Sequence, residues 1–432
     1  MIIIYSESPS KRLNFILKFV FNVLSGLEIK VVHDVNEYEN YSGAKIFYSK
    51  NKPGTGIWIK SENLLFENNI QSFPLNVIDT NWGKVFFATP ENKEIPYDIF
   101  SAIFYLLSRY EEYLPFKPDT FGRFPYTESI LYKEDVLSKP VINIWTRKLQ
   151  EILKVKFPEL EYKYPAYRFI STIDIDNAFA YREKGFVRNA GGYIRSLLQG
   201  KFNEIRERTK VLKGNVNDPY DTYDYIKTTH NKYSVVPKVF VLNGKYSKYD
   251  KNISINNAAF KKILKDLSAT CVTGIHPSYR SNFNNDLSKE KVNLEKVLEK
   301  KIFISRQHFL MLRFPQTYNQ LLSNGIHEDY SMGYSAIAGY RAGTCSSFPF
   351  FDLKNNCETA LMIYPFVWMD RTLRQHMKMN TDEAMKFISE NISQIKELGG
   401  TFVSLWHNES LSDKGYWKEW RKVFEYMMNV TK

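Results

Sequence analysis

Short apolar runs alternate with amphipathic stretches through the C-terminal two thirds of the chain. The apolar runs are rich in β-branched and aromatic residues and predict strands at 167–176, 237–242, 271–276, 302–305, 358–368 and 401–406. Helical spacing predicts helices at 257–267, 287–300 and 381–398, the last with Thr381 as its N-cap and Gly399 and Gly400 as its stop. This alternation predicts an α/β domain of parallel strands and crossover helices, either a barrel or an open doubly wound sheet.

The N-terminal third has a different pattern, with fewer strands and longer apolar helices. It predicts a strand at 1–5, a strand followed by a turn within 56–65, and helices at 13–24, 97–114 and 140–155. Residues 157–167 then hold two prolines and no periodic pattern. We therefore expect an N-terminal α/β domain at 1–160 and a second domain at 167–432.

Composition and charge narrow the class of protein. The 432 residues are 44% hydrophobic, and the net charge of +12 is spread without a block of five Lys or Arg. A diffuse positive field favours anionic partners, including an anionic membrane surface, whereas nucleic-acid binding needs a concentrated basic face. The three cysteines form no C-x-x-C pair. Because no secretory signal or membrane-spanning run is predicted, we expect a cytoplasmic protein.

Carboxylates and imidazoles follow several predicted strands at their carboxyl ends. Asp174 and Asp176 share one face at the end of the first strand, and His276, His308 and His407 follow later strands. In parallel α/β folds these strand ends meet on one side, where chemistry collects. One Asp and two His suit a divalent ion, while a second Asp and another His can act as base and acid. The set predicts metal-assisted hydrolysis of an amide or ester.

Each of these residues also has a plainer interpretation. Asp174-Ile175-Asp176 also fits a turn with Asx hydrogen bonds, or the metal motif of a glycosyltransferase, although no Gly-rich phosphate loop accompanies it. His276 fits a turn cap, and His308 and His407 fit buried packing positions. Their joint occurrence at successive predicted strand ends favours one site over separate explanations.

Five short motifs, in order, resemble those of the polysaccharide deacetylases of carbohydrate esterase family 4. STIDIDNAF resembles the first motif, which implies that Asp174 is the general base and Asp176 a metal ligand. GIHPSYRS supplies His276, but Arg280 stands where the family has a second His, and His308 in SRQHF is the substitute. GYRAGT, WMDRT and SLWHN resemble the remaining motifs through Arg341, Asp370 and His407.

The resemblance implies a fold, a reaction and a cofactor. The fold is a distorted (β/α) barrel, and the reaction removes an acetyl group from an N-acetylated sugar of a bacterial glycan. The cofactor is a divalent metal, with Zn²⁺ as the first choice. The alternative is a catalytically inactive carbohydrate-binding or scaffold protein, because the second motif lacks its second His.

The candidate residues fall into three roles and one structural network. The expected metal ligands are Asp176, His276 and His308, and the expected catalytic groups are Asp174, His407, Arg341 and Asp370. Aromatic residues suited to stacking on sugar rings are Trp406, Tyr334 and Tyr340. The N-terminal part resembles an uncharacterised domain that precedes such deacetylases in Bacteroidetes-type bacteria, and we expect its Arg109, Glu111, Glu112 and Arg123 to form a buried ion-pair network.

Overall fold

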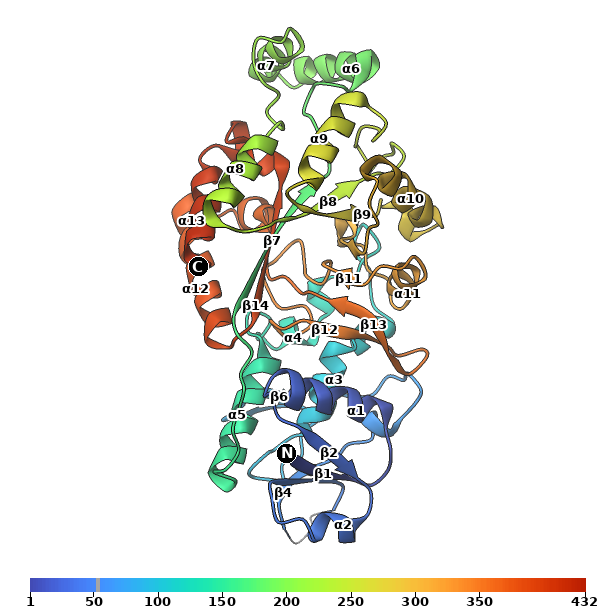
Figure 1. Ribbon diagram of the computed structural model, residues 1–432, viewed down its shortest axis with the longest axis vertical. Coiled ribbons are helices and arrows are strands. Elements are labelled where there is room, and N and C mark those ends of the chain that lie inside the picture. Colours follow the sequence, from blue (N-terminus) through green and yellow to red (C-terminus); the bar gives the residue numbers. More distant parts are fainter. Residues whose placement is uncertain (52–54) are drawn as a thin grey trace.

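A four-stranded parallel sheet organises the N-terminal part of the computed structural model, which describes residues 1–51 and 55–432 (Figure 1). The sheet order is β2-β1-β3-β4, from β1 (Ile2–Ser6), β2 (Ile29–Val32), β3 (Lys45–Ser49) and β4 (Ile57–Lys60). A hairpin of β5 (Val77–Thr80) and β6 (Gly83–Phe86) follows. The helices are α1 (Lys11–Leu17), α2 (Val35–Glu39), α3 (Ile99–Leu107), α4 (Ile130–Lys133) and α5 (Val141–Lys156).

The helix predicted at 97–114 is interrupted after its second turn. Asp98 caps α3 by accepting hydrogen bonds from the backbone N–H groups of Phe100 and Ser101. α3 ends at Leu107, and Arg109 adopts a left-handed backbone conformation with φ of 54°. A 3-10 turn at Tyr110–Tyr113 follows. The break turns the charged end of this segment toward the C-terminal part.

A curled sheet of eight strands organises the C-terminal part. Its order is β12-β13-β11-β10-β9-β8-β7-β14, and every pair is parallel except the β12–β13 hairpin. The strands are β7 (Arg168–Ile175), β8 (Lys238–Leu242), β9 (Val272–His276), β10 (Ile304–Ser305), β11 (Glu328–Asp329), β12 (Phe348–Asp352), β13 (Cys357–Ile363) and β14 (Thr401–His407). A single bridge between Met369 and Leu405 joins the segment after β13 to β14. The expected α/β alternation is confirmed, and the sheet curls around its own apolar cluster.

Helices pack against the outer face of this sheet (Figure 1). They are α8 (Tyr223–Tyr233), α9 (Ala258–Ser268), α10 (Asp286–Leu298), α11 (Gln316–Ser323), α12 (Thr381–Glu397) and α13 (Trp420–Val430). The predicted N-cap of α12 is wrong by one residue: Asn380 caps the helix, in a capping box with Glu383. Asn380 keeps an extended backbone, whereas Thr381 is already helical. Gly399, at φ 65°, follows the helix end as expected.

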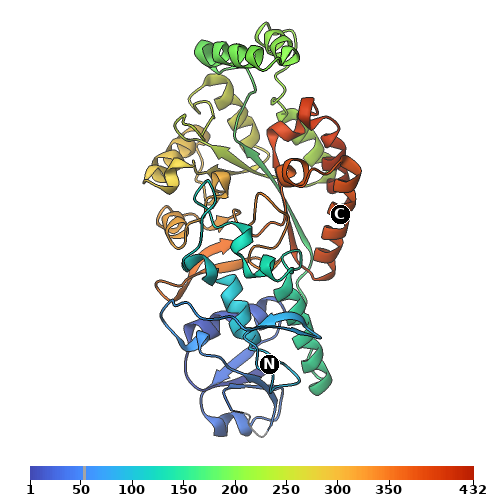
Figure 2. The same ribbon diagram turned by 180° about the vertical axis from the view of Figure 1, so that it is seen from behind.

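A helical hairpin that the sequence pattern did not predict lies between β7 and α8. It consists of α6 (Gly185–Leu198) and α7 (Phe202–Leu212). The hairpin projects from one end of the molecule, beyond α9, and Figure 2 shows the same projection from behind. Among the described residues, no helix has both the length and the apolar character needed to cross a bilayer.

Candidate metal centre and pocket

Strand register brings the predicted site residues to one end of the sheet. Asp174 in β7 pairs with His407 in β14, and β8 aligns its last residue, Leu242, with His276 in β9. Asp176 follows β7 directly, and His308 lies three residues beyond β10. Asp174, Asp176 and the three histidines line one pocket of about 340 Å³. Parallel strands ending in step therefore gather carboxylates and imidazoles that are far apart in sequence.

Asp176, His276 and His308 form the tightest group in the pocket. Oδ1 of Asp176 lies 3.2 Å from Nε2 of His276, and Oδ2 lies 3.7 Å from Nε2 of His308. One potential ligand atom from each residue lies within 4.8 Å of the others. The three residues predicted as metal ligands are thus brought together.

The Nδ1 atoms of both histidines are held from outside the group. Nδ1 of His276 lies 2.6 Å from the carbonyl oxygen of Arg306, and Nδ1 of His308 lies 2.9 Å from Oδ1 of Asp250. Because these oxygens accept, each Nδ1 carries the proton, so each neutral ring presents an unprotonated Nε2 to Asp176. Such outer partners orient metal-binding imidazoles. Sequence reasoning missed Asp250, which lies in the loop after β8 rather than at a strand end.

The donor set fits a divalent cation. Oδ1 of Asp176 is buried and accepts no hydrogen bond from the described residues. It faces Nε2 of His276, so two acceptor atoms oppose each other unless a proton or a cation lies between them. Burial alone would lower the pKa of His308, but Asp176 and Asp250 outweigh it and raise this pKa to about 9. The group therefore attracts positive charge.

Asp174 lies beside the group of Asp176, His276 and His308, and it pairs with Arg306. Oδ1 of Asp174 lies 2.9 Å from Nη1 of Arg306, and Oδ2 lies 3.9 Å from Nε2 of His276. Arg306 is fully buried, stacks 4.7 Å above the Phe240 ring and donates from Nε to the carbonyl oxygen of Tyr330. Arg306 thus orients Asp174. In the sequence, Arg306 stands directly after the predicted strand at 302–305, and this position is the signal that could have identified it.

The structure places Arg341 outside the pocket, contrary to the role expected from the sequence. Its Nε and Nη2 atoms lie 2.9 Å and 2.5 Å from the Glu112 carboxylate. Glu112 also accepts from Nε of Arg109 at 2.8 Å, and Arg109 pairs with Glu111. The expected ion-pair network therefore exists for the three N-terminal residues, and Arg341 joins it. Arg123 instead pairs with Asp119 at 2.8 Å.

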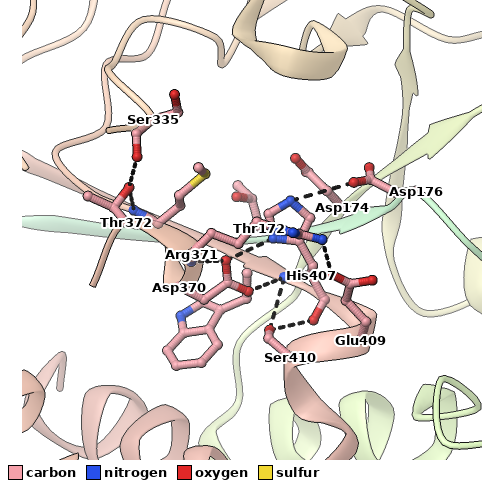
Figure 3. A network of polar contacts seen from close by, with 12 residues as sticks. Thr172, Asp174, Asp176, Ser335, Asp370, Arg371, Thr372, His407, Glu409 and Ser410 are labelled. Atoms are coloured by element: carbon pink, nitrogen blue, oxygen red, sulfur yellow. Dashed lines mark hydrogen bonds and ion pairs between the residues drawn. The ribbon is translucent and has the colours of Figure 1, made fainter. Parts of the chain in front are cut away.

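His407 and Asp370 form a hydrogen-bonded pair next to Asp176. Nδ1 of His407 lies 2.8 Å from Oδ1 of Asp370, and its Nε2 points toward Oδ2 of Asp176 at 3.8 Å. Figure 3 shows the imidazole ring between the two carboxylates. Burial lowers the pKa of His407, but the charge of Asp370 outweighs it, so the net shift is upward. Asp370 thus both orients His407 and favours its protonated form.

The three aromatic residues expected to stack on sugar do not line this pocket. Trp406 has no exposed surface and packs against Trp420 and Phe424 of α13. Side chains alternate along a strand, so His407 faces the pocket and Trp406 the helices. Tyr340 is buried and bonded to Asn391 and Gln394, and Tyr334 stacks against Arg341.

The aromatic wall of the pocket comes from other residues, one of them in the N-terminal part. Phe121, Tyr249 and Phe309 line the pocket with ring centroids 5.1 to 5.8 Å apart. Nη1 of Arg123 donates a hydrogen bond to the carbonyl oxygen of Phe309 at 2.6 Å. The Tyr279 hydroxyl donates to the carbonyl oxygen of Phe121 at 3.0 Å. A turn around residues 119–123 is thereby fastened next to the loop that carries His308.

Comparisons with known proteins give partial similarities. Residues 2–158 match a family described as a family of unknown function (DUF7033). No curated protein matches the sequence. The crystal structure of a Mycobacterium smegmatis protein described as a candidate polysaccharide deacetylase is similar with a TM-score of 0.39 and 10% identity, over 61% of this chain and 84% of that chain. The structure of a de-N-acetylase from Aggregatibacter actinomycetemcomitans is similar with a TM-score of 0.23 and 11% identity, over 39% of this chain and 89% of that chain. These low scores leave the functional conclusion to the geometry of the site.

Proposed function

We propose that this protein is a metal-dependent hydrolase that removes the acetyl group from an N-acetylated sugar of a bacterial glycan. The observation that carries the proposal is the convergence of Asp176, His276 and His308, within 4.8 Å, beside Asp174 and the His407–Asp370 pair. We also propose that the curled sheet is a distorted (β/α) barrel of the polysaccharide deacetylase type.

Asp176, His276 and His308 would hold the metal, with Zn²⁺ as the first choice for one carboxylate and two imidazoles. When bound, a divalent ion lowers the pKa of its water and polarises the acetyl carbonyl. One potential ligand atom from each of these residues already lies within 4.8 Å of the others, and Oδ1 of Asp176 accepts no hydrogen bond from the described residues.

Asp174 and His407 divide the two proton transfers of the proposed reaction between them. Asp174, oriented by Arg306, accepts the proton of the attacking water. His407, held protonated by Asp370, donates a proton to the sugar nitrogen as acetate leaves. The two groups lie in paired positions on adjacent strands, so their separation is set by the β7–β14 register.

The rest of the pocket suits a sugar unit. Its volume of about 340 Å³ is at the small end of the range for ligand pockets. Phe121, Tyr249 and Phe309 offer apolar ring surfaces, and Gln307 and Asn177 offer polar groups in the same lining. A sugar needs both kinds of contact, since its ring faces are apolar and its edge carries hydroxyl groups.

The test measures metal content and acetate release on the full chain, purified without a His tag and loaded with Zn²⁺. The substrates are p-nitrophenyl acetate and N-acetylated chito-oligosaccharides. Asp174→Asn and His407→Ala should each lower turnover about 10²–10⁴-fold with metal retained. His308→Ala should lose the metal, and His327→Ala, an exposed site outside the pocket, should change neither value.

Two results contradict the proposal. One is a metal-loaded protein that releases no acetate from either substrate. The other is near-normal turnover in both Asp174→Asn and His407→Ala.

A further inference from the structure

The α6–α7 hairpin exposes large apolar side chains to solvent. Phe186 and Leu198 are 87% and 82% exposed, and Val187, Ile194 and Leu197 are also largely exposed. At 100° per residue these five side chains fall within an arc of about 120° on α6. Scattered exposed apolar residues are ordinary, but a continuous stripe on one helix marks an interaction surface.

The stripe faces away from the rest of the protein. The other side of α6 packs on α7, where Oδ1 of Asn189 accepts from Arg208 and the Tyr193 hydroxyl bonds to Thr209. Arg188 anchors the helix by donating to the carbonyl oxygens of Lys251 and Asn252. The packing side of the helix is thus occupied, the five apolar side chains lie exposed on the other side, and the hairpin as a whole projects from one end of the molecule (Figures 1 and 2).

Positive charge surrounds the stripe. Residues 182–213 contain nine Lys or Arg and three Glu, and no acidic residue lies between Glu183 and Glu204. On α7 the exposed Arg206 and Lys210 lie four residues apart, on the same face as the exposed Phe202. An apolar helix face bordered by exposed cations is typical of segments that lie in the surface of an anionic membrane.

We propose that the α6–α7 hairpin docks this protein on the surface of an anionic lipid bilayer. The apolar stripe of α6 enters the boundary between headgroups and acyl chains, and the cations of both helices contact lipid phosphates. Charge complementarity favours an anionic bilayer over a second copy of the chain as the partner of this surface, because two hairpins with the same excess of cations repel each other. The hairpin is the next element after β7 in the chain, and Arg188 anchors it to the carbonyl oxygen of Lys251, a residue that lines the pocket. Docking therefore places the catalytic end of the sheet next to the membrane.

The experiment is vesicle sedimentation of the full chain at low and high salt. Vesicles of phosphatidylglycerol and phosphatidylcholine are compared with vesicles of phosphatidylcholine alone. The anionic vesicles should bind the protein at least about tenfold better, and 0.5 M salt should reduce the difference because it shortens the Debye length. Ile194→Ser/Leu198→Ser should lower binding to anionic vesicles by at least about tenfold.

Matched variants separate the hairpin from general surface properties. Val155→Ser/Val236→Ser removes two exposed apolar side chains elsewhere and should bind as the unaltered protein does. Arg206→Glu/Lys210→Glu should abolish the preference for anionic vesicles, whereas Lys289→Glu/Lys296→Glu, with the same change in charge on α10, should retain most of it. Circular dichroism and thermal unfolding verify that each variant is folded.

Three results overturn the proposal. The first is absence of binding to anionic vesicles at low salt, and the second is equal binding by the folded Ile194→Ser/Leu198→Ser variant. The third is light scattering that shows a dimer dissociated by this variant without vesicle binding, which assigns the stripe to a second copy of the chain. None of these results depends on acetyl hydrolysis, so docking and the proposed function fail independently.

Discussion

At the scale of single residues, the hydrogen bonds that hold the proposed metal ligands are as informative as the ligands themselves. The carboxylate of Asp250 fixes the tautomer of His308, and it is itself held by the backbone N–H of Tyr279 and the hydroxyl of Ser247. Burial raises the pKa of Asp250, but its bond to His308 outweighs that effect and the net shift is downward. Asp250 thus remains an anion that keeps Nε2 of His308 available to a metal.

Replacing Asp250 tests this positioning role. We expect Asp250→Asn to weaken metal affinity about 10–100-fold, because the ring of His308 loses the anion that fixes its tautomer. Competition with a chromogenic chelator measures the affinity, and circular dichroism verifies the fold. The exposed Asp266→Asn on α9 is the matched control. Unchanged affinity in Asp250→Asn would show that His308 does not need this partner.

At the scale of elements, α3 depends on one buried carboxylate. Asp98 accepts from the backbone N–H groups of Phe100, Ser101 and Glu62 and from the hydroxyls of Tyr48 and Ser101. It therefore caps α3 and also joins the helix to β3 and to the segment after β4. Every residue of α3 is buried, so the packing of the N-terminal part is organised around this helix.

Removal of this cap should be costly. We expect Asp98→Ala to lower the free energy of unfolding by at least about 2 kcal/mol, because the cap is lost and several buried donors lose their acceptor. Asp34→Ala, which removes the exposed cap of the short helix α2, should cost less. Urea denaturation followed by circular dichroism compares the two. Equal losses would mean that the additional contacts of Asp98 contribute nothing.

At the scale of the whole molecule, the two parts of the chain share a buried charged interface. Arg341 from the C-terminal part and Arg109 from the N-terminal part meet on Glu112. Burial raises the pKa of Glu112, but the two guanidinium groups outweigh it and the net shift is downward. This network contacts both parts, and the 119–123 turn of the N-terminal part lies beside the pocket through Arg123 and Phe121.

The role of Arg341 can be separated from catalysis. Arg341→Met should lower the free energy of unfolding by about 3–5 kcal/mol, since it leaves buried charge uncompensated. Arg341→Met/Glu112→Leu should recover part of the loss, because it removes both partners. Thermal and urea denaturation give the energies. Turnover per folded molecule should stay within a few-fold of the unaltered value, and a loss comparable with that of Asp174→Asn would return Arg341 to the active site.

The N-terminal part should also contribute to substrate binding. We expect Phe121→Ala to raise KM for an N-acetylated oligosaccharide about 3–10-fold, because the sugar loses one aromatic contact, and we expect little change in kcat. Turnover of the small ester p-nitrophenyl acetate should change little. Phe303→Ala, half exposed and outside the pocket, is the control. An unaltered KM for the oligosaccharide would place the sugar elsewhere.

The sequence alone predicted the elements and residues whose signals are local. Periodicity located β7, β8, β9 and β14 and the helices α5, α9, α10 and α12 to within a few residues, because each pattern lies within one segment. Polar residues at or shortly after the ends of predicted strands identified Asp174, Asp176, His276, His308 and His407, which the structure brings into one pocket. Strand-end position predicted them because parallel strands end on a common edge.

Only the tertiary structure decided which distant groups meet. Arg306 rather than Arg341 pairs with Asp174, Asp250 supports His308 across 58 positions, and Arg123 contacts Phe309 across 186. A single sequence carries no signal for such pairs, since each depends on how separate loops fold over one edge of the sheet. The burial of Trp406 and the exposure of the α6 stripe were decided in the same way, because apolar patterning alone does not tell which apolar face finds a partner within the molecule.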